Sequence, residues 1–414
     1  MARTTLSEPA PLESPTQRAH RRRSRLAVGS GAIALLLFFA HFFNDLFSGT
    51  LAALLPSLQI RFGVSELTLA LFVACLSFSS SVLQPLFGAA ADRFGHRLVV
   101  ATGVIVSSSI LSLIAIMPSP LWLVPLLLLG GLGSAAYHPA ATTLARRAAS
   151  SKGGLALAVF SAGGTIGLSF GPLVIGFFLI RGWLAYSPVL MIPGIVLGAL
   201  IYLLTPPVPQ QTGARRAKVF DVDLFRGPVG QLCLAGVLRS IAWVSMINGA
   251  PLWLVNTKGL AATDPIVFWT ITVFTFSGAA GGILIGAIEN RFSRQFLVTG
   301  TMLLATVPLA VLLLSQPGTV LYFVAVAFAG ILANGGLPIM VLAAQDAAPH
   351  AVATASGMMM GLTWGTAGLL YLVVGAVQEA IGMSAAMWLS VVPLLPGALV
   401  AYRVLRRLQA AERR

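Results

Sequence analysis

Long apolar stretches recur along the whole 414-residue chain, separated by short polar segments. Only 9% of the residues are charged and 57% are hydrophobic, whereas a soluble domain is about 25% charged. The mean hydropathy is +0.90. Each stretch offers the roughly 20 apolar residues that a helix needs to cross the hydrocarbon core of a bilayer. The sequence therefore predicts an all-α polytopic membrane protein, embedded in a lipid bilayer.

Charged residues and Pro or Gly turns divide these stretches into twelve predicted membrane-spanning helices. Six lie in the first half of the chain, at residues 29–58, 66–90, 98–117, 121–145, 154–180 and 184–204, and six in the second half, at 230–256, 265–288, 295–315, 319–345, 353–377 and 383–405. The predicted organisation is a tail at 1–28, a six-helix bundle at 29–204, a linker at 205–228, a second six-helix bundle at 229–405 and a tail at 406–414. We expect the two bundles to surround a central cavity.

Basic residues gather on one predicted side of the membrane. With both termini inside, most of the 26 Lys and Arg residues fall in the tails and inside loops, while Arg61, Arg181 and Lys258 fall outside. Because cytoplasmic loops carry the excess of Lys and Arg, both termini are expected in the cytoplasm. The asymmetry also explains the net charge of +14, so we expect a bacterial plasma membrane protein and no binding of nucleic acid.

Motifs for nucleotide or metal chemistry are absent from the sequence. It contains no Gly-rich phosphate loop ending in Lys-Ser or Lys-Thr and no paired His-Glu metal helix. We therefore expect no enzymatic activity, no cofactor and no metal site. The expected partners are a small-molecule substrate and protons, and the protein is expected to act as a monomer.

The two halves look like copies of one unit. Aligning "GAAADRFGHR" at 88–97 with "GAIENRFSRQ" at 286–295 pairs Gly88 with Gly286 and Arg93 with Arg291. A second alignment pairs Pro139 with Pro338. Both matches fall at the same place in their half, as two six-helix repeats require.

The segment 88–97 resembles the loop signature that the major facilitator superfamily keeps between its second and third helices. "HFFNDLFSGTLAALLPSL", "GLGSAAYHPAATTLARRAAS" and "ASGMMMGLTWGTAGLL" further resemble the fosmidomycin-resistance-type branch of that superfamily. The resemblance implies a transporter in which the signature residues latch the cytoplasmic side of the two halves, namely Gly88, Asp92, Arg93, Gly95 and Arg97. Gly88 would admit close backbone packing, Gly95 a tight turn, and Asp92 would bind another helix end or an arginine. In the second copy Asn290 and Ser293 replace the acid and a glycine, so no second latch is expected there.

A stripe of small residues marks the predicted fifth helix. "GTIGLSFGPLVIG" contains Gly167, Gly171, Pro172 and Gly176, with Gly167 and Gly171 four residues apart. Glycines four apart allow close helix packing, and proline removes a main-chain hydrogen bond. The pattern resembles the fifth-helix motif of antiporters.

Three polar residues interrupt the first apolar run, in "HFFNDLFSG". His41 and Asp45 are four residues apart and share one helical face, with Asn44 adjacent. An ionised carboxylate at mid-membrane costs about 2.5–3.5 kcal/mol, so it persists where partners stabilise it or where its charge changes during function. This favours a proton-coupling site at Asp45 and His41; a hydrogen-bonded cluster with a purely structural role is the alternative.

Arg239 is the one Lys or Arg residue placed deep inside a predicted helix, away from both ends. Superposing Pro56 on Pro251 sets Arg239 opposite Asn44. The sequence leaves three roles open for Arg239: pairing with Asp45, binding an anionic substrate group, or reaching away from the interior.

His138, in "YHPAA", is the third candidate for proton coupling, although a helix-bending His-Pro element is an equal alternative. It lies about 25 Å along its helix from the outer side, so no direct contact with Asp45 is expected. Ala140 stands where the resembled branch often has an acid. Aromatic and amide residues complete the candidate substrate-binding set: Tyr137, Trp243, Asn248, Asn334, Trp364 and Tyr371.

The function expected from these features is secondary active transport. Proton-coupled export of a small drug-like or anionic compound is favoured, and proton-coupled uptake of a metabolite is the main alternative. A sensor or channel on a transporter scaffold is a minor one.

Overall fold

The computed structural model describes residues 30–148, 153–206, 222–349 and 351–412, and every regular element in this part of the chain is helical. The predicted tail at 1–28 and most of the predicted linker lie outside the described residues. Eleven described helices are long and apolar enough to cross a membrane. A bent pair, Glu66–Val82 and Gln84–Phe94, turns through 41° and makes a twelfth span. The predicted twelve-helix, all-α architecture is confirmed for the described residues.

Each predicted span corresponds to a helix or to two consecutive helices. The first half contains α2 (Ser30–Phe62), α3 (Glu66–Ser77) with α4 (Gln84–Phe94), α5 (His96–Leu111), α6 (Pro120–Ala148), α7 (Gly153–Ile180) and α8 (Met191–Leu204). The second half contains α10 (Pro228–Asn256), α11 (Pro265–Ala287), α12 (Arg294–Leu314), α13 (Val320–Gly335) with α14 (Leu337–Ala347), α15 (Val352–Gly357) with α16 (Thr363–Ile381), and α17 (Met383–Val391) with α18 (Leu394–Glu412). A short helix, α9 (Val222–Arg226), lies within the segment predicted as a linker.

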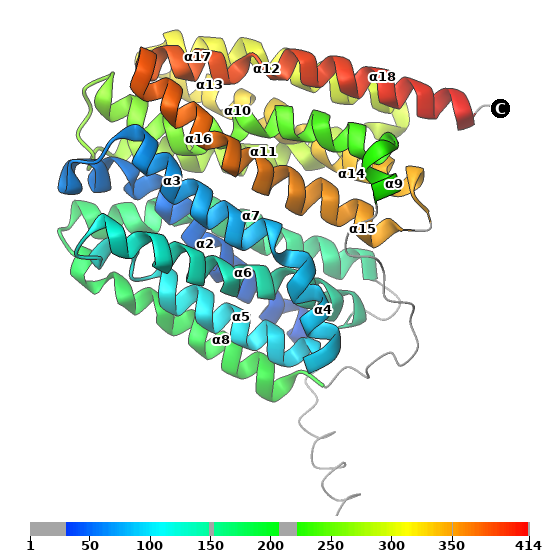
Figure 1. The fold of residues 1–414 in the computed structure, drawn as a ribbon, viewed down its shortest axis with the longest axis horizontal. Helices are drawn as coiled ribbons and strands as arrows, with labels where there is room; N and C mark the ends of the chain where they lie inside the picture. The colour runs from blue at the N-terminus through cyan, green and yellow to red at the C-terminus, as the bar shows by residue number, and fades with distance from the viewer. Residues whose placement is uncertain (1–29, 149–152, 207–221, 350, 413–414) are drawn as a thin grey trace, which may run out of the picture.

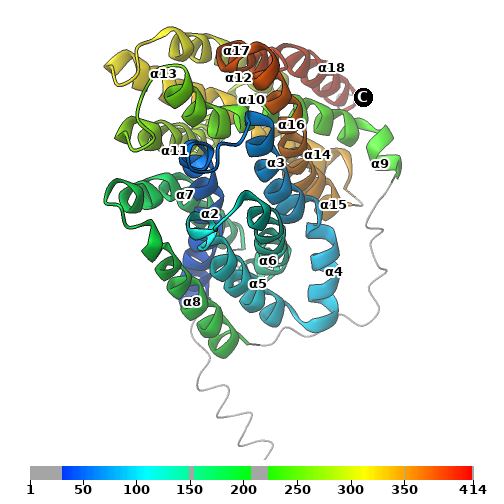
Figure 2. The same cartoon turned by 60° about the vertical axis from the view of Figure 1, so that its left-hand side comes forward.

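The two halves form two bundles that lie side by side (Figures 1 and 2). Successive spans alternate in direction, so α2 begins and α18 ends at the same end of the molecule, on the right in Figure 1. We call this the terminal end, and the other the opposite end. Helices α3 and α16 pack together across the boundary between the halves, as do α7 and α11.

The buried apolar residues show how the halves are joined. One cluster draws on both halves, and its members lie between the middle of the spans and the opposite end, from Leu46 on α2 to Leu394 on α18. Toward the terminal end the core divides into two clusters, one within each half. At the opposite end Asn256 on α10 also donates a hydrogen bond to Gln59 on α2, at 2.8 Å. The halves are therefore packed together at the opposite end and separately at the terminal end.

Helix α2 lies directly against α7 because α7 presents glycines to it. A Cβ atom added at Gly163, Gly167 or Gly171 would lie 2.1–2.4 Å from the main-chain oxygens of Phe38, Phe42 and Leu46, respectively. Three glycines four residues apart thus face three carbonyls four residues apart. This close approach fixes the position of the α2 segment that carries His41 and Asp45.

Candidate functional site

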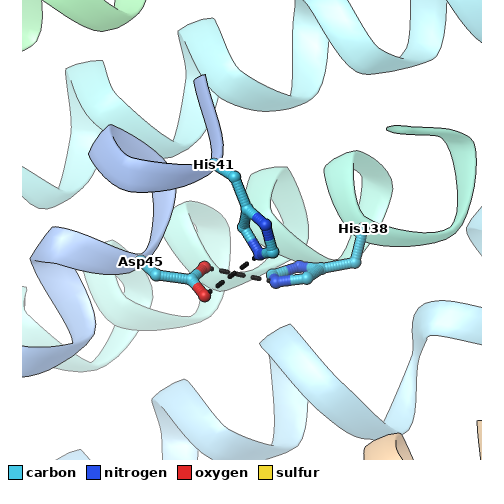
Figure 3. Close-up of side chains that lie close together, drawn as sticks. All are labelled: His41, Asp45 and His138. Carbon is cyan, nitrogen blue, oxygen red and sulfur yellow. Dashed lines mark ion pairs between the residues drawn. The ribbon is translucent and has the colours of Figure 1, made fainter. Parts of the chain in front are cut away.

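A carboxylate and two imidazoles meet inside the first half (Figure 3). His41 and Asp45 project from neighbouring turns of α2, and His138 reaches them from α6. The Nε2 atom of His41 lies 3.2 Å from Oδ2 of Asp45, and the Nε2 atom of His138 lies 3.2 Å from Oδ1. We call these three residues the triad. The side chains of Asp45 and His138 keep 22% and 25% of their surface exposed, so solvent reaches them, whereas that of His41 keeps 8%.

Both imidazoles are held at their second nitrogen by a main-chain carbonyl. The Nδ1 atom of His41 lies 2.7 Å from the oxygen of Phe160, and the ring stacks on the Phe160 ring with centroids 4.2 Å apart. The Nδ1 atom of His138 lies 2.8 Å from the oxygen of Ser134. Because a carbonyl oxygen only accepts hydrogen bonds, both Nδ1 atoms carry hydrogen. Both rings therefore direct Nε2 at Asp45.

Neighbouring side chains complete the support of Asp45. Asn44 donates to Oδ1 of Asp45 at 2.9 Å and to the Ser134 hydroxyl at 3.0 Å. Tyr137 is buried and donates its hydroxyl to the oxygen of Leu37 at 3.0 Å. Asn44 and Tyr137 were predicted as substrate-binding candidates, and in this structure they make contacts that position the triad and the α2 backbone.

The contact between His138 and Asp45 contradicts the sequence-based expectation that these residues do not touch. That expectation measured the depth of His138 from one helix end and assumed straight helices of one length. Helix α2 has 33 residues and α6 has 29, both more than the roughly 20 needed to cross a bilayer. Spans of this length tilt, and the reach of an imidazole side chain closes the remaining separation.

Sequence reasoning missed Ser134, Phe160 and Gly164 as parts of this site. A Cβ atom at Gly164 would lie 2.4 Å from Nε2 of His41 and 2.6 Å from Oδ2 of Asp45. Glycine is thus the only residue that leaves room for the triad here. The sequence did contain a signal for Gly164. The four-residue spacing of glycines continues upstream from Gly167 to Gly163, and Gly164 is the next residue.

Two imidazoles and a carboxylate are also the donor types that bind divalent transition metals. The nearest ligand atoms of the triad lie within 4.8 Å of one another. The 3.2 Å separations between imidazole nitrogen and carboxylate oxygen are ion-pair distances, and the Nε2 atom of His41 has no hydrogen-bond partner among the described residues. The cluster thus brings together three groups that can each bind a proton.

A second polar cluster lies in the other half, around the guanidinium of Arg239. This side chain is buried and donates to the oxygen of Ala333 at 2.8 Å, to Oδ1 of Asn334 at 3.0 Å and to the Ser240 hydroxyl at 3.0 Å. Within the described residues no carboxylate pairs with it, and its Nε atom has no hydrogen-bond partner. In this conformation Arg239 thus does not pair with Asp45, nor does it reach away from the interior.

The remaining substrate-binding candidates divide between this cluster and the apolar core. Trp243 is buried, with its ring centroid 4.6 Å from that of Phe274 and 6.2 Å from that of Trp364. Asn248 donates to Val244 of its own helix. The hydroxyl of Tyr371 lies 3.4 Å from Nε2 of Gln378. Neither Asn248 nor Tyr371 has a described hydrogen bond to the triad or to Arg239.

The loop signature shows its turn, and Asp92 and Arg97 contact neighbours within the first half. Gly95 has φ of +97° between α4 and α5, which supports the tight turn expected there. Asp92 is 77% exposed and lies 3.4 Å from His96, while Arg97 donates to the oxygen of Thr205 and lies over the ring of Tyr202. The guanidinium of Arg93 lies 5.4 Å from the ring centroid of Phe94. A Cβ atom at position 88 would meet only Pro139, at an ordinary 3.7 Å, so the expected role of Gly88 in close backbone packing is wrong.

The second half contains an ion-pair cluster that the sequence did not indicate. Arg294 pairs with Glu289 at 2.7 Å and with Asp346 of α14 at 2.6 Å. No second latch was expected because Asn290 and Ser293 replace the acid and a glycine of the signature. The acids that pair with Arg294 are instead Glu289 and Asp346. Only the fold shows that Asp346 lies beside this loop.

The glycines of the fifth-helix stripe pack against two different neighbours. Gly167 and Gly171 contact α2, as described above, and Pro172 lies where a Cβ atom at Gly49 would be 2.9 Å from its ring. Gly176 instead faces the other half, because a Cβ atom there would lie 2.6 Å from the Phe268 ring on α11. The stripe thus joins α7 both to its own bundle and to the opposite one.

Comparison with known proteins identifies the scaffold. The uncharacterized MFS-type transporter YfnC of Bacillus subtilis is 25% identical over 365 residues, covering 86% of this chain and 88% of that protein. The fosmidomycin resistance protein of Escherichia coli is 24% identical over 384 residues, covering 90% and 91%. The glycerol-3-phosphate transporter of Bacillus subtilis is 25% identical over 390 residues, covering 85% and 86%.

Solved structures share the fold. A mutant of the nucleoside transporter NupG superposes with a TM-score of 0.74 at 16% identity, covering 91% of this chain and 99% of that one. A bacterial homolog of the human lysosomal transporter Spinster superposes with a TM-score of 0.71 at 16% identity, covering 92% and 98%. The model of the Major Facilitator Superfamily matches residues 37–371. With twelve spans in two bundles and a match over most of its length, this chain belongs to the Major Facilitator Superfamily.

Proposed function

We propose that this protein is a proton-coupled exporter of a small anionic compound that works by alternating access. The observation that carries the proposal is the triad, a carboxylate held between two imidazoles in the interior of a membrane bundle. Such a site can take up and release protons with little movement of the backbone, because the groups that exchange protons are already in contact.

The anionic character of the substrate is inferred from Arg239. A buried guanidinium held only by neutral acceptors keeps much of the cost of removing its charge from water. An anionic substrate group would supply the missing counter-ion through two parallel hydrogen bonds. Export is favoured over uptake by the likeness to a protein named for resistance to fosmidomycin.

Orientation follows from the helix ends. At the terminal end lie Arg93, Arg97, Arg291, Arg294 and Arg403, while Arg61, Arg181 and Lys258 lie at the opposite end. By the positive-inside rule the terminal end faces the cytoplasm of a bacterial plasma membrane. The separate apolar cores at that end and the exposure of Asp92 support a conformation in which the two halves are not latched on the cytoplasmic side.

The experiment is transport by purified protein in liposomes, with radiolabelled fosmidomycin and glycerol 3-phosphate as the first two probes. An imposed pH gradient should drive accumulation by the wild type. Asp45→Asn should abolish this accumulation but retain exchange of labelled for unlabelled substrate, because Asn keeps the size and hydrogen bonding of Asp and cannot change charge. The direction of the proton gradient that drives accumulation separates export from uptake.

An Asp45→Asn protein that still accumulates substrate at the expense of the pH gradient would remove the triad from the coupling mechanism. Substrate-independent conductance would indicate a channel. If neither probe moves, a growth-inhibition screen of cells with and without the protein, across phosphonates and aromatic acids, identifies the compound to label.

A further inference from the structure

The triad has the make-up of a transition-metal site. One ligand atom from each of its three residues lies within 4.8 Å of the other two. Two imidazoles and a carboxylate are ligands that Zn²⁺ and similar divalent ions accept. Among the described residues this is the only group of three such side chains close enough to hold one ion. Metal motifs within one helix do not reveal it, because the ligands come from both α2 and α6.

The spacing of the ligand atoms suits a single ion. The Nε2 atom of His41 lies 3.2 Å from Oδ2 of Asp45, and the Nε2 atom of His138 lies 3.2 Å from Oδ1. Two ligands that each lie roughly 2.0–2.1 Å from a tetrahedral zinc ion are about 3.3 Å apart. The carboxylate therefore stands at a suitable distance from each imidazole to share an ion with it.

The Nε2 atom of His41 is independent evidence for a bound cation. The Nδ1 atom of this ring carries hydrogen, because it lies 2.7 Å from the main-chain oxygen of Phe160. In the neutral imidazole the Nε2 atom then has a lone pair. His41 is only 6% exposed, and its Nε2 atom faces Asp45 with no hydrogen-bond partner among the described residues. A buried lone pair directed at a carboxylate is unfavourable. A metal ion bound to both atoms removes this cost, since neutral imidazole is the form that binds metals.

The surroundings of the ligands are those of metal-binding residues. Histidines that bind a metal almost always donate their other ring N–H to a carbonyl, a carboxylate or water, which fixes the orientation of the ring. The Nδ1 atoms of His41 and His138 lie 2.7 Å and 2.8 Å from main-chain oxygens. Carboxylates that bind a metal are hydrogen-bonded in turn, and Asn44 donates to Oδ1 of Asp45 at 2.9 Å. All three ligands are thus held in place by neighbouring groups.

Solvent reaches one side of the triad. The side chains of Asp45 and His138 are 22% and 25% exposed, whereas that of His41 is 8% exposed. An ion can therefore enter from the side of Asp45 and His138. A zinc ion with three protein ligands keeps a fourth position for water or another small ligand, and this exposed side can supply it.

We infer that the triad binds a divalent transition-metal ion of the zinc type through the two Nε2 atoms and the carboxylate of Asp45, with water at the remaining position. The ion joins α2 to α6 within the first half. This inference goes beyond the proposed function and does not depend on it. Where proton coupling also uses these atoms, bound Zn²⁺ should block pH-driven accumulation.

The test is a titration of the full-length protein in detergent with Co²⁺, which reports its coordination through visible absorption. The protein carries no polyhistidine tag and is first stripped of metal with EDTA. The wild type should bind one Co²⁺ per chain, with the intense visible bands of a four- or five-coordinate ion. Zn²⁺ should displace the Co²⁺, whereas Mg²⁺ should not, because it prefers oxygen ligands.

His138→Gln and Asp45→Asn each remove one ligand. Each should weaken Co²⁺ binding by more than the roughly 10–100-fold that loss of an outer-shell partner costs. His96→Gln is the matched control. His96 also lies four residues from an acid, 3.4 Å from Asp92, but no third ligand in the described part of the chain completes a site there. The control should bind Co²⁺ as the wild type does, and size-exclusion chromatography checks that each variant is folded.

A wild type that shows no such absorption would overturn the inference, whatever the folding of a variant. Unchanged Co²⁺ binding by folded His138→Gln and Asp45→Asn proteins would also overturn it, because the ion would then be bound elsewhere in the chain. The titration uses neither substrate nor a pH gradient, so the metal site and the proposed transport can fail separately.

Discussion

Three neighbouring residues stabilise the carboxylate of Asp45 inside the bilayer. His41 and Asn44 come from its own helix, and the sequence placed all three together. His138 lies far along the chain and contacts Asp45 only through the packing of α6 against α2. Gly164 on α7 borders the same site, and because glycine has no side chain it leaves the space that the triad fills. A carboxylate without these partners would carry the full insertion cost of about 2.5–3.5 kcal/mol.

Gly164→Ala should separate His41 from Asp45, because the added methyl group would lie 2.4 Å from Nε2 of His41. His41 has little freedom to move, since its other nitrogen is held by Phe160. We expect a strong loss of pH-driven accumulation in liposomes, with a loss of stability of about 1–3 kcal/mol from overpacking. Gly300→Ala is the control, as a Cβ atom there meets nothing within 4 Å. Equal accumulation by the two variants would contradict the assigned role of Gly164.

The contact between α2 and α7 is made by main chain against main chain. Helix association in a bilayer depends on close packing, since lipid chains are as apolar as the side chains they replace. Gly163, Gly167 and Gly171 supply that packing along three turns. Because the groups they meet are carbonyls of a regular helix, no side-chain movement can make room for a larger residue.

Gly167→Ala should therefore force the two helices apart, since its Cβ atom would lie 2.1 Å from the oxygen of Phe42. We expect a lower midpoint of thermal unfolding in detergent, and a larger drop than for Gly164→Ala, which meets side-chain ends. Gly31→Ala on α2 should leave the midpoint near that of the wild type, because a Cβ atom there has no neighbour within 4 Å. A Gly167→Ala protein as stable as the Gly31→Ala protein would mean that α2 and α7 can separate at little cost.

The whole molecule is organised as two bundles that share a core at one end only. Alternating access requires this end to open when the terminal end closes. Contacts that cross between the halves at the opposite end, such as Asn256 with Gln59, must then break in each cycle. Contacts within one half, such as Gln59 with Glu66, need not.

Cross-linking tests this difference. With Cys75 and Cys233 replaced by Ser, the pair Gln59→Cys and Asn256→Cys should react with a short bifunctional thiol reagent, which spans a gap wider than a disulfide bridges. Transport should stop after cross-linking of this pair. The matched pair Gln59→Cys and Glu66→Cys lies within one half and should cross-link without loss of transport. Continued transport by the first pair after cross-linking would show that the halves stay joined at this end.

Hydropathy and charge alone determined the span count, the boundaries between spans and the all-α class, because each is a local property of about 20 consecutive residues. The helical period also placed His41, Asn44 and Asp45 on one side of their helix. The structure alone decided that His138 meets Asp45, that Arg239 lies against Ala333 and Asn334, and that Asp346 pairs with Arg294. These contacts join residues far apart in the chain. They depend on helix tilt, on helix length in excess of the bilayer thickness and on how closely the glycines let helices approach. The residue pattern of a single helix does not specify any of these.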